Sequence, residues 1–93
     1  MQAQINRGGF VVGTLELGEV TPEALANLYL DNFAGDEHRD GNAPLIDCKH
    51  LTVFPILDRE SGQITGALVR PLHHSGSGYY TWDWVMGPER ILR

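Results

Sequence analysis

Three runs of apolar, β-branched and aromatic residues occupy the second half of the chain, between Leu51 and Met86. The segments between them, 58–63 and 75–78, consist of Gly, Ser and charged or amide residues. Apolar runs separated by such turn residues are typical of consecutive β-hairpins. The pattern therefore predicts a three-stranded antiparallel meander at the C-terminal end of the chain.

The register of this meander decides which residues share a face, because successive side chains of a strand point to opposite faces. Centring the first turn pairs Asp58 with Gln63, and centring the second pairs His74 with Tyr79. Pro71 is the weak point of this register, because proline cannot donate a hydrogen bond to a neighbouring strand. A bulge or a strand end near Pro71 would shift residues 72–79 by one position.

The predicted register gives the meander one aliphatic and one aromatic face. The aliphatic face would carry Leu51, Val53, Leu57, Ile64, Leu68, Leu72, Thr81 and Val85. The other, which we call the aromatic face, would carry Cys48, His50, Thr52, Phe54, Ile56, Ala67, Val69, Pro71, His73, Tyr80, Trp82, Trp84 and Met86.

One segment of the first half combines several signals for an α-helix. Thr21 suits the N-cap, Pro22 the first helical position, and Glu23 the positive end of the helix dipole. Apolar side chains then recur at helical spacing, and Gly35 is placed to end the helix. The sequence predicts a helix over residues 22–34 whose apolar stripe packs on the aliphatic face.

Residues 3–17 alternate between apolar and polar side chains in their first part, which is typical of a strand. Gly8 and Gly9 form either a hairpin turn between two short strands or a bulge in one long strand, and the sequence leaves both open. A chain of 93 residues has room for one core. We therefore predict a single α+β domain over residues 1–93, with one helix packed on an antiparallel sheet of four to five strands.

The amino-acid composition of the chain argues against two classes of binding partner, nucleic acids and membranes. The formal net charge is −5, from 7 basic and 12 acidic residues, whereas a nucleic-acid backbone is held by clustered Lys and Arg. No apolar run approaches the ~18 residues that span a bilayer. The first residues also lack the basic start and apolar core of a secretory signal. We expect no nucleic-acid binding, no membrane contact and a cytoplasmic location.

Cys48 is the only cysteine, which excludes an intramolecular disulfide and a multi-cysteine zinc site. The predicted register places it at one end of the aromatic face with His50 and His73, a candidate metal site. Cys48 with His50 is also the best-supported pair of nucleophile and base. The spacing matches no metal or catalytic motif, and a buried thiol beside polar edge residues is the simpler explanation. We predict no cofactor and no enzyme activity.

The aromatic face is the most unusual feature of the sequence. Its large side chains either belong to the core or, if exposed, form a partner surface, because Trp and Tyr bury much area at low entropic cost. The residues predicted to bind a partner are Tyr80, Trp82, Trp84 and Phe54 on this face and Asp36, Glu37 and Asp40 in the loop after the helix.

These features predict a non-enzymatic protein-interaction module, such as the small inhibitors or regulators that phages and mobile elements carry. The partner would be another protein or a second copy of the chain in a homodimer. The alternative is a binder of a small aromatic or nucleotide-like molecule, stacked on Trp82 and Trp84 beside His50 and His73. A Cys/His metal-dependent protein is the third interpretation. The sequence identifies neither partner nor ligand.

Overall fold

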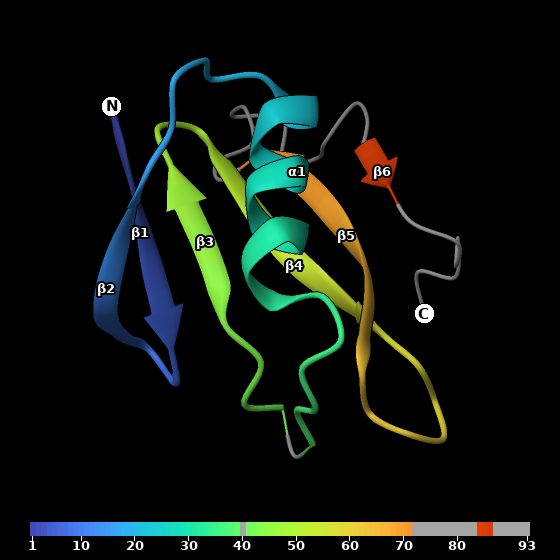
Figure 1. Cartoon of the computed structure of the whole chain (residues 1–93). Coiled ribbons are helices and arrows are strands. Elements are labelled where there is room, and N and C mark those ends of the chain that lie inside the picture. Colours follow the sequence, from blue (N-terminus) through green and yellow to red (C-terminus); the bar gives the residue numbers. More distant parts are fainter. Residues whose placement is uncertain (40, 72–83, 87–93) are drawn as a thin grey trace, which may run out of the picture.

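One α-helix lies across one face of an antiparallel β-sheet (Figure 1). The structure is a computed structural model that describes residues 1–39 and 41–71 and the backbone of residues 84–86. Within these residues the sheet has six strands in the order β2-β1-β3-β4-β5-β6, and all neighbours are antiparallel. The predicted α+β fold, with one helix packed on an antiparallel sheet, is therefore confirmed.

The first two strands form a hairpin at one side of the sheet. β1 (Gln2–Arg7) and β2 (Phe10–Glu16) are joined by a two-residue turn of Gly8 and Gly9. Both glycines have positive φ angles, 61° and 87°, which are open to a residue without a Cβ atom and match the twist of the flanking strands. The chain thus forms a hairpin here, which decides between the two alternatives that the sequence left open.

Helix α1 (Pro22–Phe33) begins and ends as the sequence predicts. The Thr21 hydroxyl accepts a hydrogen bond from the Ala24 N–H at 3.1 Å, which satisfies one of the free donors of the first turn. Ala34 is the C-cap, and Gly35 follows it with a φ of 90°, in the left-handed region that commonly ends helices. The local signals therefore suffice to place this element.

Two further strands follow the helix. β3 (Leu45–Cys48) and β4 (Leu51–Leu57) are joined by the tight turn of Lys49 and His50, in which Lys49 has a positive φ of 53°. The prediction that Cys48 and His50 share one face of the sheet is wrong, because Cys48 ends β3 and His50 lies in the turn that reverses the chain. Neither Lys nor His is a typical turn residue, so the turn has no clear sequence signal.

β5 (Ile64–Pro71) pairs with β4, and the turn between them has the predicted register. The Asp58 N–H donates a hydrogen bond to the Gln63 carbonyl oxygen at 2.8 Å. The Asp58 carboxylate accepts hydrogen bonds from the Ser61 N–H, at 2.8 Å, and from the Ser61 hydroxyl. These bonds hold the pKa of Asp58 below its usual value, the Ser61 N–H making the largest contribution.

Beyond the turn, the register of the meander differs from the prediction. Leu57 lies opposite Ile64, but Ile56 lies opposite Gly66, so Thr65 is an extra residue in β5. A shift of one residue moves every later side chain to the other face. From Gly66 onwards β5 pairs regularly with β4 as far as Pro71, the last residue of the strand. The face towards the helix carries Leu51, Val53, Ala67 and Val69, whereas the opposite face carries Thr52, Phe54, Ile56, Leu68 and Arg70.

The short strand β6 (Trp84–Met86) completes the described sheet beside β5. Trp84 lies opposite Val69 and Met86 opposite Ala67. This is the register that centring the second turn on residues 74–79 predicts, so the pairing of the last two strands is confirmed.

The main core lies between α1 and the sheet. The helix packs mainly on β5 and β4, and the Tyr29 hydroxyl donates a buried hydrogen bond of 2.7 Å to the Pro44 carbonyl oxygen. This bond ties the helix to the chain just before β3. The core consists of Ala3, Leu17, Leu25, Ala26, Tyr29, Ala43, Ile46, Cys48, Val53, Ile64, Ala67 and Val69.

Candidate interaction surface

The structure separates the residues of the predicted aromatic face. Phe54 lies opposite Leu68 on the face turned away from the helix, whereas the backbone pairing sets Trp84 opposite Val69. Val69 belongs to the core beneath the helix. The positions of Phe54 and Trp84 are therefore on opposite faces of the sheet, and the prediction of one shared aromatic face is wrong.

Phe54 is half-buried, and its ring lies 5.8 Å from the guanidinium carbon of Arg70. A cation at this distance is attracted to the ring face, so Phe54 already has a partner within the protein. Four other predicted site residues lie outside the described part of the chain: Asp40, His73, Tyr80 and Trp82.

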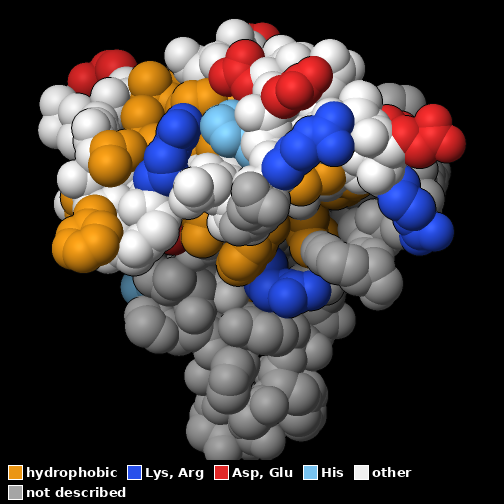
Figure 2. Space-filling model, turned by 90° about the horizontal axis from the view of Figure 1, so that it is seen from below, with side chains coloured by type: hydrophobic (Ala, Val, Ile, Leu, Met, Phe, Trp, Pro, Cys, Tyr) orange, Lys and Arg blue, Asp and Glu red, His pale blue; other side chains and the backbone are white. Residues whose placement is uncertain are grey.

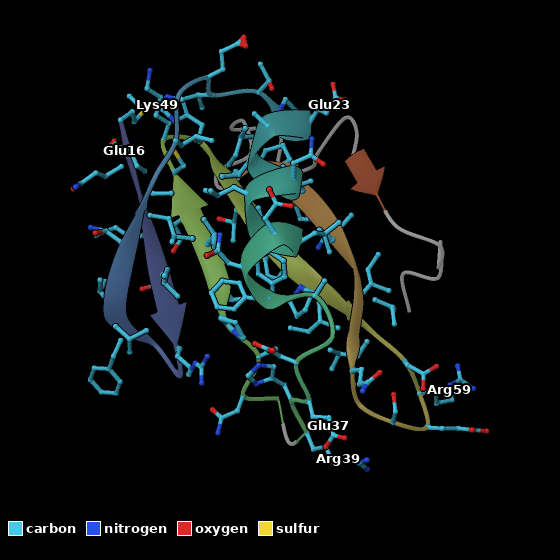
Figure 3. The ribbon with its side chains drawn as sticks, viewed as in Figure 1. Glu16, Glu23, Glu37, Arg39, Lys49 and Arg59 are labelled. Carbon is cyan, nitrogen blue, oxygen red and sulfur yellow. The ribbon has the colours of Figure 1, made fainter. Side chains whose placement is uncertain are left out.

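The predicted acidic loop is pinned to the β4–β5 hairpin. The backbone of residues 35–38 makes three hydrogen bonds with residues 62–64, with N···O distances of 2.9 to 3.0 Å. The Arg39 guanidinium donates a further bond of 2.8 Å to a carbonyl oxygen of the same hairpin. Asp36 and Glu37 are exposed, and Figure 3 shows Glu37 and Arg39 together at the lower end of the molecule. The described loop is thus ordered and carries both signs of charge.

The candidate metal and nucleophile residues lie in different environments. Cys48 is 3% exposed and belongs to the core, whereas His50 is exposed in the β3–β4 turn. Within residues 1–39 and 41–71, no three His, Cys, Asp or Glu side chains are grouped to hold a metal ion. His73 falls outside these ranges, so a site that includes it stays a prediction.

A polar cluster joins three strands on the face away from the helix. The Asp47 carboxylate accepts a hydrogen bond from the Thr52 hydroxyl, at 2.7 Å, and another from the Asn6 side-chain amide. An open groove of about 540 Å³ runs beside it, lined by Asn6, Gly8, Gly9, Gly41, Ala43, Leu45, Asp47, Pro55 and Leu57. None of these lining residues is aromatic, so the groove does not match the stacking pocket of the small-molecule alternative.

The most exposed large apolar side chains among the described residues lie in β2. Phe10 is 75% exposed, Val11 55% and Val12 58%. Figure 2 shows apolar side chains gathered on the side of the molecule that the β1–β2 hairpin forms. Because the three residues are consecutive, apolar side chains project from this end of the strand in more than one direction.

A β-bulge explains this local pattern. Ile5 lies opposite Gly13, but Asn6 lies opposite Val11, so Val12 is an extra residue in β2. After the bulge the strand alternates regularly again, and Leu15 packs against the core. The bulge therefore separates an exposed apolar end of β2 from a regular half.

β2 is an outer strand of the sheet, and no other described strand pairs with its free side. The Leu17 N–H donates a hydrogen bond of 2.7 Å to the Met1 carbonyl oxygen, on the side of β1. Hydrogen bonding towards one neighbour alternates along an antiparallel strand, so Leu15 also bonds to β1. The N–H and C=O groups of Thr14 and Glu16 consequently point towards the free edge.

This free edge has little protection against pairing. Natural edge strands usually carry Lys, Pro or a bulge that prevents other strands from adding to them. β2 contains neither Lys nor Pro, and its only charged residue, Glu16, forms an ion pair of 3.1 Å with the Met1 ammonium group. The bulge at Val12 interrupts one half of the strand, so residues 13–16 remain a regular and open edge.

The sequence did not predict this surface. It predicted strand structure over residues 3–17 but left open one strand or two, and the position of β2 in the sheet depends on contacts distant in sequence. The run of Phe10, Val11 and Val12 beside a Gly-Gly pair was the available signal: three consecutive apolar residues break the alternation expected of a half-buried strand.

Comparison of the chain with protein-family models, with curated proteins and with solved structures found no match. In the part of the chain that the structure describes, no helix has the length and apolar character to cross a membrane. The surface of the β1–β2 hairpin is therefore the feature of the described residues that bears most directly on function.

Proposed function

We propose that the protein is a non-enzymatic protein-interaction module that binds its partner through the β1–β2 hairpin. The exposure of Phe10, Val11 and Val12 carries this proposal. Contiguous exposed apolar residues mark binding surfaces in soluble proteins, and burial of one large apolar side chain contributes roughly 1.5–3 kcal/mol. Phe10 would be the anchor, because aromatic residues dominate the energy of protein interfaces.

The hairpin is suited to binding because it is held rigidly. β1 is paired on both sides, with β2 and with β3. A preorganised surface loses little conformational entropy when a partner binds. The open edge at Thr14 and Glu16 adds backbone groups that can receive an extended segment of a partner.

The groove extends this binding surface towards the loop after the helix. Its lining includes Gly8 and Gly9 of the hairpin turn together with Gly41 and Ala43 of the loop, and the turn and loop lie at the same end of the molecule (Figure 1). A small protein that covers a partner in this way would act as an inhibitor or regulator, by occupying a surface that another molecule needs.

The test is the dependence of partner binding on Phe10. Affinity capture with the wild-type protein identifies the partner, and the dissociation constant is then measured with purified components. We expect Phe10→Ser to weaken binding at least about tenfold, whereas Phe10→Tyr, which keeps the aromatic anchor, retains it. Phe10 makes few core contacts, so both variants should melt like the wild type. Equal affinity of all three proteins would contradict the proposal.

A further inference from the structure

We propose that β2 of one copy pairs with β2 of a second copy, so that two sheets join into one continuous antiparallel sheet. This inference rests on the proposed function, because it names a partner for the same hairpin. The outward N–H and C=O groups of Thr14 and Glu16 are the hydrogen-bonding groups that a neighbouring strand would use. An identical strand related by a two-fold axis offers the same groups in return.

The regular half of β2 fixes the register of this pairing. With the two-fold axis at Leu15, Thr14 of each copy lies opposite Glu16 of the other. The backbone N–H and C=O groups of both residues point towards the partner strand. Each such pair exchanges two backbone hydrogen bonds. The side chains of Thr14 and Glu16 share the face away from the helix and are exposed. The half-buried Leu15 side chains meet on the helix side of the joined sheet.

The local charge favours a second copy in spite of the net charge of −5. The β1–β2 hairpin carries one acidic residue, Glu16, and one basic residue, Arg7. Glu16 is already paired with the Met1 ammonium group. Within β2 itself, the edges of two approaching copies would therefore carry no unpaired charge.

The regular pairing covers only part of β2. The strand ends at Glu16 and the chain then continues to α1, while the bulge at Val12 interrupts the other half. This makes the contact short, and interfaces below about 1,200 Å² are usually weak or transient. The dimer should therefore dissociate on dilution.

The experiment measures sedimentation of the full chain over a wide range of concentrations, for the wild type and for two variants of Thr14. Thr14→Pro removes the outward N–H without removing a bond to β1. Thr14→Val keeps that N–H and serves as the matched control. We expect a concentration-dependent dimer in the wild type and in Thr14→Val, and at least about tenfold weaker dimerisation in Thr14→Pro. Far-ultraviolet circular dichroism verifies that each variant is folded.

Oxidative cross-linking supplies a second measurement, in case Thr14→Pro does not fold. Leu15→Cys in a Cys48→Ser background should form a disulfide between copies, because facing residues of this type have Cα atoms about 4.5 Å apart. Gln4→Cys in the same background, on the exposed side of β1, should not. A wild type that stays monomeric, a dimer that persists in Thr14→Pro, or the absence of the Leu15→Cys cross-link would each overturn the inference. Phe10-dependent binding of a different protein would still support the proposed function.

Discussion

Tyr29 connects the helix to the loop that precedes β3, and its hydroxyl is the only polar atom that it brings into the core. The hydroxyl donates to the Pro44 carbonyl oxygen at 2.7 Å. Burial raises the pKa of Tyr29 above its ordinary value; the charge of Arg7 opposes this shift, and that of Asp36 adds to it. The folded protein therefore keeps this hydroxyl protonated under conditions in which the unfolded chain loses the proton.

We predict that Tyr29→Phe lowers the free energy of unfolding by about 1–3 kcal/mol at neutral pH, because the buried Pro44 carbonyl loses its partner. The stabilisation from Tyr29 is complete below the ordinary tyrosine pKa of about 10 and declines as the pH rises above it. Urea denaturation of both proteins at several alkaline pH values should show the difference between them shrinking. A difference that does not change with pH would contradict the raised pKa.

The sequence also predicted single residues that cap a helix or close a turn in their own stretch of backbone. Thr21 and Gly35 flank α1 as expected, and Asp58 closes the β4–β5 turn. The turn at Lys49 could not be predicted, because the positive φ of Lys49 is imposed by the pairing of β3 with β4 and not by the preference of lysine.

At the scale of secondary-structure elements, Gly62 lies where the β4–β5 hairpin contacts the loop after the helix. Its φ is 75°, and a Cβ atom there would lie 3.0 Å from the Cγ atom of Arg39. We predict that Gly62→Ala lowers the free energy of unfolding by about 1–2 kcal/mol, because the left-handed conformation disfavours a side chain. Thermal or urea denaturation measures the change.

Gly18→Ala is the matched control for this prediction. Gly18 has no atom within 4 Å of an added Cβ and is not among the glycines with positive φ. Its replacement should change the free energy of unfolding by less than about 0.5 kcal/mol. Equal free energies of unfolding for Gly62→Ala and Gly18→Ala would contradict the left-handed conformation of Gly62.

Two β-bulges explain why the sequence predicted the strands and turns but not which side chains share a face of the sheet. The strands and turns of the meander follow the apolar runs, but Thr65 in β5 shifts the register and exchanges the two faces. Val12 does the same in β2 and exposes the apolar end of the hairpin. A bulge is stabilised by the fit of the whole sheet, so a pattern of apolar residues gives no direct sign of it.

For the whole molecule, the buried thiol reports how far the native structure opens. Cys48 is 3% exposed and lies in the core between α1 and the sheet. We predict that a thiol reagent labels Cys48 slowly in native buffer and that the labelling rate rises with urea in step with unfolding. Rapid, complete labelling of the native protein would instead mark Cys48 as an accessible and reactive thiol.

At this scale the sequence predicted the single helix on an antiparallel sheet but not the binding surface. The aromatic residues drew attention to the C-terminal strands, whereas the most exposed large apolar side chains of the described residues lie at the N-terminal hairpin. The position of β2 at the edge follows from the pairing of β1 with β3 across the intervening helix, a long-range contact that no local pattern encodes.

The most direct test of the binding surface is amide hydrogen exchange of β2, measured by nuclear magnetic resonance at low and high protein concentration. Gly13 and Leu15 bond to β1 and should be protected at both concentrations. The outward amides of Thr14 and Glu16 should exchange fast in dilute protein and become protected as the concentration rises. If these two amides exchange equally fast at every concentration, the edge of β2 does not pair with a second copy.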